Sequence, residues 1–223
     1  MIWGHRQGFA NREEAGKQLA EAVAQLGLDN PVILALPRGG VPVAFEVAKA
    51  LGAPLDVILV RKIGAPGHEE YGIGALVDGD SPQVVIDEAA ARMVGADQAY
   101  IDRKVEEQLL EIERRRTAYR TGPPIPLKGR TVVVVDDGIA TGGTVRAALK
   151  ALAKSDAGKV VLAIPVAPAD VLPEMRAHCD EVICLATPDP YYAVGAHYRD
   201  FGQTEDCEVI DLLSQAKAWQ PGD

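Results

Sequence analysis

The chain has 223 residues, of which 48% are hydrophobic and 25% are charged, and its formal net charge is −9 at pH 7. This composition is that of a globular protein, and the length fits one large domain rather than a disordered or fibrous chain. The acidic balance disfavours duplex nucleic acid as the main partner, because affinity for nucleic acid comes largely from basic contacts to phosphates.

Apolar runs and apolar side chains at helical spacing alternate along the chain. The runs that predict strands cover residues 31–37, 55–60, 83–87, 131–135, 159–166 and 181–186. The helices are expected at residues 11–27 (with Asn11 as N-cap and Gly27 as the end), 40–51, 88–120 (broken at Gly95, with Asp97 capping the second part), from 144 onward, near 168–178, and at 205–218. Residues 61–82 are rich in Gly, Pro and charge, and are expected to form a long flexible loop with a possible hairpin around residues 72–77.

Strands that alternate with helices predict an α/β fold, a Rossmann-like parallel sheet flanked by helices. Ligands of such sheets bind outside the carboxyl ends of the strands. The loops that follow residues 37, 60, 136, 166 and 186 are therefore the expected site.

The cellular setting also follows from the residues. No apolar run approaches the roughly 20 residues that span a bilayer, and the first residues contain no apolar signal core. The three cysteines, Cys179, Cys184 and Cys207, are odd in number and lack metal-ligand spacing. We therefore expect a cytoplasmic protein without a membrane or nucleic-acid partner.

The most informative segment is TVVVVDDGIATGGT, residues 131–144. Four consecutive valines predict a strand buried on both faces, and Asp136 and Asp137 stand at its carboxyl end. In the glycine-rich loop that follows, backbone N–H groups and the start of a helix favour an anion, and Thr141 and Thr144 add hydroxyl donors. The two carboxylates would repel a phosphate, whereas a sugar diol or Mg²⁺ suits them.

This combination resembles the 5-phosphoribosyl-1-pyrophosphate (PRPP) signature of type I phosphoribosyltransferases, and residues 140–144 resemble the Ala-Thr-Gly-Gly-Thr of adenine phosphoribosyltransferases. The alternative is an ordinary turn between a strand and a helix of another α/β protein. The resemblance implies the type I phosphoribosyltransferase fold, Mg²⁺ as cofactor and a homodimer. It also implies PRPP and a small nitrogenous base or nucleoside monophosphate as partners.

The resemblance further implies roles for the signature residues. Asp136 and Asp137 would hold the ribose hydroxyls of PRPP, directly or through Mg²⁺. The phosphate contacts would come from the loop, namely Gly138, Ala140, Thr141, Gly142, Gly143 and Thr144. The expected organisation is a single domain over residues 1–223. It has a core of about 10–186, a helical insertion of about 88–120, and a hood formed by about 187–223 with the N-terminal segment.

Two basic segments follow earlier strands. Arg38 precedes a glycine pair, and its guanidinium and the amides beside it can bind pyrophosphate. The resemblance gives Arg38 and Gly39 that role. Arg61 and Lys62 are adjacent cations before a loop that could close over a ligand. By likeness to adenine phosphoribosyltransferases they would contact pyrophosphate, and Glu70 would lie near the base; the alternative for Glu70 is a solvated turn.

The segment DPYYAVGAHYRDFG, residues 189–202, resembles the base-binding stretch of hypoxanthine-guanine phosphoribosyltransferases. On that likeness Tyr192 would stack on a base, while Val194 and Arg199 take the matching places. Alternatively these aromatic residues pack a small cap. Those enzymes carry an Asp at the position of Ala140, where it donates a proton to the purine or accepts one. The residues therefore do not indicate a 6-oxopurine substrate.

Three functions are compatible with these residues. The first is transfer of the 5-phosphoribosyl group between PRPP and a nitrogenous base. The second is a non-catalytic regulator that senses PRPP or a nucleotide, and the third is a hydrolase or phosphatase acting on ribosyl phosphates. The retained cations Arg61 and Lys62 favour an enzyme over a regulator, and no water-activating base stands out for a hydrolase.

Overall fold

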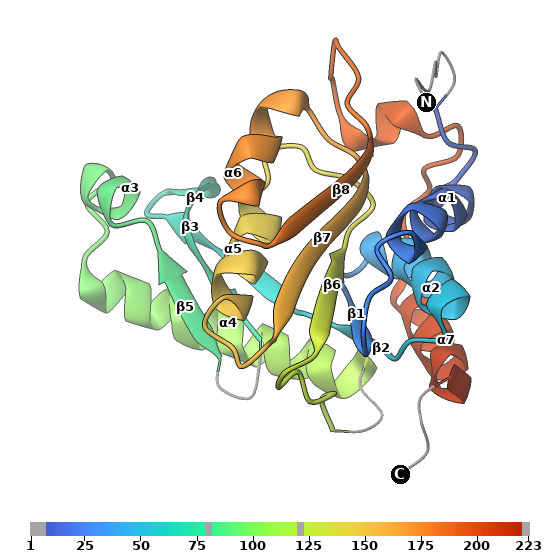
Figure 1. Ribbon diagram of the computed structural model, residues 1–223. Coiled ribbons are helices and arrows are strands. Elements are labelled where there is room, and N and C mark those ends of the chain that lie inside the picture. Colours follow the sequence, from blue (N-terminus) through green and yellow to red (C-terminus); the bar gives the residue numbers. More distant parts are fainter. Residues whose placement is uncertain (1–7, 79–81, 120–122, 220–223) are drawn as a thin grey trace.

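The valine strand β6 (Thr131–Val135) lies at the centre of a five-stranded sheet in the computed structural model, which describes residues 8–78, 82–119 and 123–219 (Figure 1). The strand order is β2-β1-β6-β7-β8, and every neighbouring pair is parallel. The other strands are β1 (Pro31–Ala35), β2 (Leu55–Val57), β7 (Lys159–Val166) and β8 (Glu181–Ala186). The predicted α/β fold with a parallel sheet is therefore confirmed.

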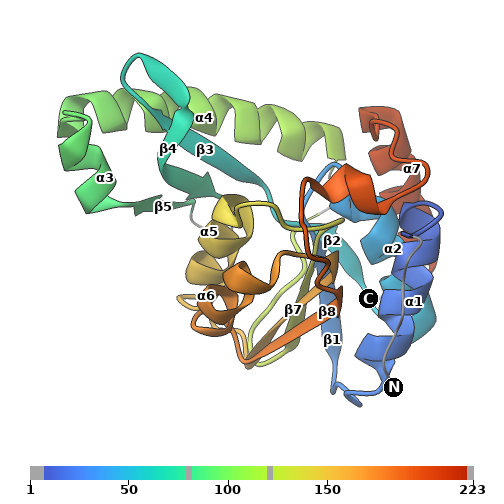
Figure 2. The same ribbon diagram turned by 90° about the horizontal axis from the view of Figure 1, so that it is seen from above.

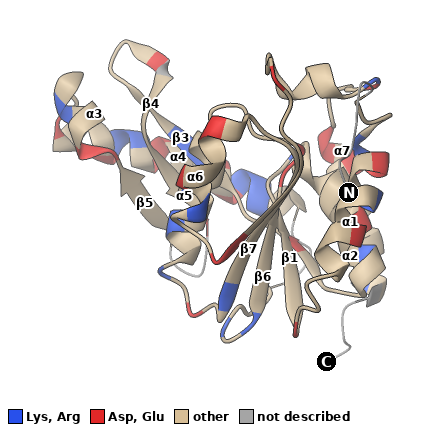
Figure 3. Cartoon of the chain, turned by 45° about the horizontal axis from the view of Figure 1, so that its top comes forward, with Lys and Arg blue, Asp and Glu red and all other residues tan. Residues whose placement is uncertain are grey.

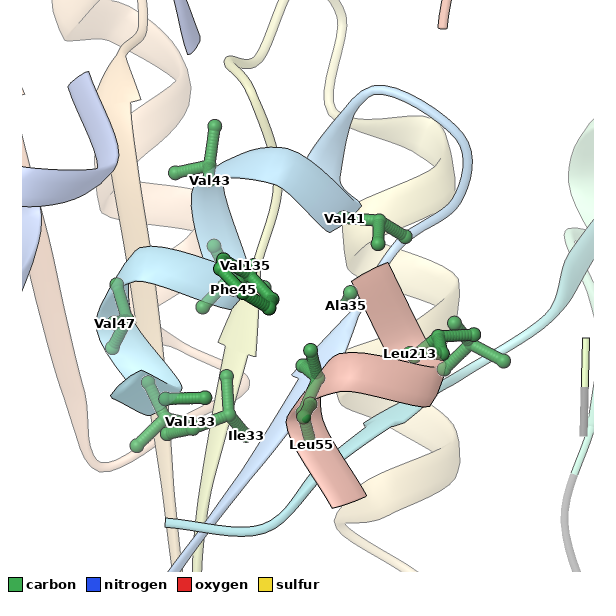
Figure 4. Packing of buried hydrophobic residues seen from close by; sticks show 14 of the residues in the cluster. Ile33, Ala35, Val41, Val43, Phe45, Val47, Leu55, Val133, Val135 and Leu213 are labelled. Carbon is green, nitrogen blue, oxygen red and sulfur yellow. The ribbon is translucent and has the colours of Figure 1, made fainter. Parts of the chain in front are cut away.

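Successive side chains of β6 point to opposite faces of the sheet, so its valines are divided between two hydrophobic cores. Val133 and Val135 face helices α1 (Arg12–Ala24), α2 (Gly40–Leu51) and α7 (Asp206–Ala216). Figure 4 shows Val133 and Val135 beside Ile33 and Ala35 of β1, under the side chains of α2 and α7. Val132 and Val134 face α5 (Gly143–Leu152) and α6 (Leu172–Arg176) on the other side. Burial on both faces explains why this strand has no polar side chain between Val132 and Val135.

A second sheet replaces the long loop expected after residue 60. It is antiparallel, in the order β3-β4-β5, and consists of β3 (Val60–Ala65), β4 (His68–Val77) and β5 (Gln83–Ile86). The expectation of a loop over residues 61–82 was therefore wrong, and so was that of one strand over 55–60. The chain leaves the parallel sheet after Val57, and Pro66 and Gly67 turn it back at a positive φ of 73° for Gly67.

The helical segment after this sheet is broken as expected. It consists of α3 (Glu88–Met93) and α4 (Gln98–Tyr119), with Gly95 at a positive φ of 69° between them. The Asp97 carboxylate accepts a hydrogen bond from the Tyr100 N–H at 2.8 Å, so Asp97 caps α4. The antiparallel sheet lies between α4 and α5 (Figure 2). Ile112 and Tyr119 on α4 reach the core beside α2 and α7.

Residues 187–205 lie beyond the last strand and are called the hood segment below. They contain one short 3₁₀ helix, η2 (Val194–His197), and pair with the start of the described chain. The N–H of Phe9 donates to the carbonyl of His197 at 2.8 Å, and the N–H of Arg199 donates to the carbonyl of Phe9 at 2.8 Å. The helix α7, which the expected hood included, packs instead against α2 in the main core.

Two further 3₁₀ helices, η1 (Ala169–Val171) and η3 (Lys217–Trp219), complete the described elements. Within the described ranges, no helix is both long and apolar enough to cross a bilayer.

Candidate functional site

The loops that follow β1, β6, β7 and β8 are tied together at the carboxyl edge of the parallel sheet. The N–H of Leu36 donates to the carbonyl of Val135 at 2.9 Å, which places the start of the β1 loop against the end of β6. The N–H of Ile139 donates to the carbonyl of Val166 at 2.9 Å, which ties the β6 loop to the end of β7. The edge at which ligands of parallel sheets bind is therefore made by the residues that the sequence singled out.

The acidic pair lies at the centre of this edge and is largely buried. The N–H of Asp137 donates to Oδ1 of Asp136 at 2.9 Å. Burial, and then the charge of Asp137, raises the pKa of Asp136 well above its usual range. Burial also raises the pKa of Asp137, while the hydrogen bond and charge of Arg12 act in the opposite direction. Two adjacent carboxylates that are costly to ionise require a cation or a hydrogen-bond donor.

The cation that the structure supplies is Arg12, in the first turn of α1. Its Nε lies 2.8 Å from Oδ2 of Asp137, and its Nη1 donates to the carbonyl of Gly202 at 2.7 Å. The guanidinium also lies over the Phe201 ring, 3.9 Å from the ring centroid. Sequence reasoning did not find this residue, because a single arginine after an N-cap belongs to no motif and its partners lie far away in the chain.

The loop after the acidic pair has the features of an anion site. It leads into α5, which begins at Gly143 after Gly142 at a positive φ of 75°. Among the described residues, no group accepts a hydrogen bond from the backbone N–H of any residue from 140 to 144. A Cβ at Gly143 would meet nothing within 4 Å. Open amides at the start of a helix, with space in front of them, can bind a phosphate.

The loop after β1 lies directly against the acidic pair. A Cβ built on Gly39 would stand 2.1 Å from Oδ2 of Asp137, so only glycine fits there. Arg38, which follows a cis peptide bond, extends toward α7, and its Nη1 lies 3.6 Å from Oδ1 of Asp206. Asp206 also accepts a hydrogen bond from the Tyr119 hydroxyl at 2.5 Å. The structure thus brings Gly39 to the acidic pair and holds Arg38 against the start of α7.

Arg61 and Lys62 lie in β3 and not on a loop. Nε of Arg61 donates to Oε1 of Gln108 on α4 at 2.9 Å. Burial, and then the charge of Arg115, lowers the pKa of Arg61. In Figure 3 both Lys or Arg and Asp or Glu segments lie along α4, so the helix beside the hairpin carries charges of both signs. Within the described part of the chain, no hydrogen bond or ion pair joins Arg61 to the acidic pair. The backbone of Glu70 belongs to β4, but its side chain lies outside the described residues.

The three residues expected to bind a base are placed differently from one another. Val194 lies against the signature loop, with its Cγ1 2.6 Å from where a Cβ on Gly138 would stand. The Tyr192 side chain is 80% exposed, and Arg199 is also exposed. The residue before Tyr192, Tyr191, which the sequence did not single out, donates its hydroxyl to the carbonyl of Ile139 at 2.6 Å. Of the expected trio, Val194 contacts the signature loop, while Tyr192 and Arg199 are exposed.

The donor set is compatible with Mg²⁺ carried by a substrate. Asp136 and Asp137 supply carboxylate oxygens, which are the ligands that Mg²⁺ prefers. No group of three or more His, Cys, Asp or Glu side chains arranged for a metal occurs among the described residues. Two carboxylates leave most of an octahedral shell to substrate oxygens and water, which is how Mg²⁺ is usually bound at phosphate sites.

Comparison with known proteins agrees with this geometry. Residues 9–200 match the phosphoribosyl transferase domain family. The chain is 48% identical over 209 residues to "Putative phosphoribosyl transferase Rv0571c" of Mycobacterium tuberculosis H37Rv. A protein of the CDC 1551 strain of the same species, "Putative phosphoribosyl transferase MT0597", is equally similar. These matches cover 93% of this chain and 47% of each relative, so the chain spans about half the length of the curated relatives.

Among solved structures, that of TT1426 from Thermus thermophilus is similar over nearly the whole chain. It has 44% sequence identity and a TM-score of 0.80, covering 94% of this chain and 99% of the other. The family match spans both the signature strand and the hood segment as far as residue 200. By this match, and by the acidic pair and open loop at the carboxyl edge of its parallel sheet, the chain belongs to the phosphoribosyl transferase domain family.

Proposed function

We propose that the chain transfers the 5-phosphoribosyl group between PRPP and a nitrogenous base, with release or uptake of pyrophosphate. The observation that carries the proposal is the juxtaposition of a buried acidic pair with a loop of open backbone amides. A sugar diol fits carboxylate acceptors, and a phosphate fits the amides at the start of α5. PRPP presents both groups on one ribose ring.

In this proposal each part of the site has one task. Asp136 and Asp137 accept hydrogen bonds from the ribose 2′- and 3′-hydroxyls, directly or through Mg²⁺. Residues 138–144 bind the 5-phosphate with their N–H groups and with the hydroxyls of Thr141 and Thr144. When bound with PRPP, Mg²⁺ would neutralise charge on the pyrophosphate and ribose oxygens.

The cationic residues address the leaving group. Arg38 precedes Gly39, which lies against the acidic pair, while Arg61 and Lys62 lie on the hairpin. As the bond between C1 of ribose and pyrophosphate breaks, negative charge grows on the leaving oxygen and positive charge on C1. Catalysis by such a site consists of positioning and charge neutralisation. The proposal places the base under the hood segment, with Val194, Tyr192 and Arg199 as its candidate contacts. The homodimer implied by the resemblance and the cytoplasmic setting expected from the residues are part of the same proposal.

Binding is tested by calorimetry with PRPP and Mg²⁺ on the wild type and on the double variant Asp136→Asn, Asp137→Asn. We expect the wild type to bind and the variant to lose binding while it remains folded, because the amides keep the side-chain size. Unchanged affinity in the variant would contradict the assignment of the acidic pair.

Turnover is tested separately by pyrophosphate release with a panel of nucleobases. Release that depends on one base supports a transferase. Binding of PRPP without release by any base would instead support a PRPP-sensing regulator.

A further inference from the structure

Arg12 joins three parts of the molecule that are distant in sequence. Its contacts are the carboxylate of Asp137 at 2.8 Å, the carbonyl of Gly202 at 2.7 Å and the ring of Phe201 at 3.9 Å. Only 13% of each side chain of the Arg12–Asp137 pair is exposed. The guanidinium is therefore held on one side by the acidic pair and on the other by the hood segment.

The loop after β1 completes this arrangement. A Cβ on Gly39 would stand 2.1 Å from Oδ2 of Asp137 and 3.4 Å from Nε of Arg12. The ion pair thus occupies the space that a side chain at position 39 would need. The hydroxyl of Tyr198 adds a hydrogen bond of 2.5 Å to the backbone carbonyl of Asp137. Side chain and backbone of Asp137 are both fixed by residues from outside the signature.

This fixation has a physical consequence for a ligand. Asp136 and Asp137 lie side by side in a poorly solvated place, where their carboxylates repel each other. A single cation beside Asp137 reduces that repulsion and also restricts the rotamer of its side chain. A group whose geometry is set before the ligand arrives loses less conformational entropy on binding.

We propose that Arg12 is a positioning residue for PRPP, which holds Asp137 in the geometry that accepts the ribose hydroxyls and links it to the hood segment. This inference rests on the proposed function. Arg12 acts through Asp137 and does not itself contact the reacting atoms. Two other roles are the outcomes to be distinguished. Arg12 could serve only to attach the hood segment, or it could compete with the ligand for Asp137.

The test compares dissociation constants for PRPP with Mg²⁺, together with melting temperatures, in the wild type, Arg12→Gln and Arg12→Lys. We expect Arg12→Gln to weaken PRPP binding about tenfold to a hundredfold, as for loss of other residues that orient a ligand-binding group. Arg12→Lys should restore part of the affinity, because it keeps the charge but loses the planar fork. The matched control is Lys17→Gln, which removes an exposed ion pair with Glu13 from the same helix. Its affinity for PRPP should equal that of the wild type.

The possible results separate the proposals. If the wild type fails to bind PRPP, the proposed function is overturned and this inference with it. If the wild type binds and folded Arg12→Gln binds equally well or more tightly, only the positioning role is overturned. If Arg12→Gln does not fold, Phe201→Leu replaces it, because it removes the ring beneath the guanidinium and leaves the ion pair intact. Arg12→Lys should then bind PRPP more weakly than Phe201→Leu, and equal affinities in the two variants would overturn the positioning role.

Discussion

The hydroxyl of Tyr191 donates a hydrogen bond of 2.6 Å to the backbone carbonyl of Ile139. This contact joins the hood segment to the loop that is proposed to bind the 5-phosphate. Burial raises the pKa of Tyr191 to about 12, so its hydroxyl stays protonated and remains a donor at neutral pH.

Tyr191→Phe should therefore weaken both the fold and PRPP binding. A hydrogen bond of this kind contributes about 0.5–1.5 kcal/mol, which for a domain of this size shifts the melting temperature by roughly 1–6 °C. Thermal unfolding and calorimetry with PRPP measure the two effects. Tyr192→Phe is the matched control, because the neighbouring ring is 80% exposed. Equal effects of the two substitutions would contradict a specific role for Tyr191.

Tyr192→Ala should raise the KM for the base and leave PRPP affinity unchanged. An exposed ring beside the site is available to stack on a planar ligand, which contributes about 1–3 kcal/mol per base and corresponds to roughly a tenfold to hundredfold change in affinity. Steady-state kinetics with the base identified by the turnover screen provides the measurement. A lowered melting temperature with an unchanged KM would show that Tyr192 packs the hood segment instead.

Arg61→Ala and Lys62→Ala should slow transfer about a hundredfold or more, the size of effect typical for loss of one charge-stabilising group. Binding of the nucleoside monophosphate should change little, because that product lacks the pyrophosphate these cations address. Single-turnover rates and product dissociation constants test this. Arg103→Ala, which removes a surface cation of α4 near Tyr100, is the control. Comparable losses of monophosphate affinity and of rate would place both cations at the 5-phosphate or in the fold.

Gly39→Ala should disturb the acidic pair from the opposite side. The new Cβ would stand 2.1 Å from Oδ2 of Asp137, so the carboxylate must move or the loop must shift. Such overpacking costs about 1–3 kcal/mol of folding stability, and we expect loss of PRPP binding as well. Gly143→Ala is the control for stability alone, since its Cβ meets nothing within 4 Å. If Gly39→Ala had the stability and PRPP affinity of the wild type, the close approach of residue 39 to the Asp137 carboxylate would be refuted.

The stability of the hood segment should fall in mild acid because of His197. Burial lowers the pKa of this imidazole below its usual value of 6.5. The unfolded chain therefore binds the proton more readily than the folded protein. The contribution of neutral His197 is fully present above pH 6.5 and is lost as the pH falls through the lowered folded value. The ring also packs against Tyr191 at a centroid distance of 5.0 Å.

Unfolding free energies between about pH 8 and pH 5 test this dependence, since only histidine among ordinary side chains titrates there. The wild type should lose more stability across the range than His197→Gln, which keeps the backbone carbonyl that accepts from Phe9. Parallel curves for the two proteins would show that another group titrates.

The sequence predicted the parallel sheet well because its strands are continuous apolar runs. The expected strands over residues 159–166 and 181–186 agree with β7 and β8, and the helix over residues 40–51 agrees with α2. The prediction of one strand over residues 55–60 was wrong for the same reason. Ile58 and Leu59 continue the apolar run although the chain has already left the parallel sheet. The Pro66–Gly67 pair was the available signal, since such a dipeptide favours a turn between two strands.

The candidate site was predictable only where it is local in sequence. The acidic pair and the loop to Thr144 are one continuous segment, so their proximity follows from the strand and helix that flank them. The contact of Arg12 with Asp137 joins residues 125 positions apart, and neither periodicity nor spacing encodes it. The same holds for Tyr191, whose partner Ile139 is 52 positions away.

The Arg12–Gly202 hydrogen bond joins residues 190 positions apart, with all the described strands between them. During synthesis at about 5–20 residues per second, the two partners emerge from the ribosome roughly 10–40 s apart. The strands of the parallel sheet and the acidic pair are therefore made before the hood segment. Until then Arg12, on α1, lacks two of its contacts, the carbonyl of Gly202 and the ring of Phe201. Of these parts, the hood segment and then α7 are made after the last strand, so a nascent chain has all its sheet strands before it can complete the site.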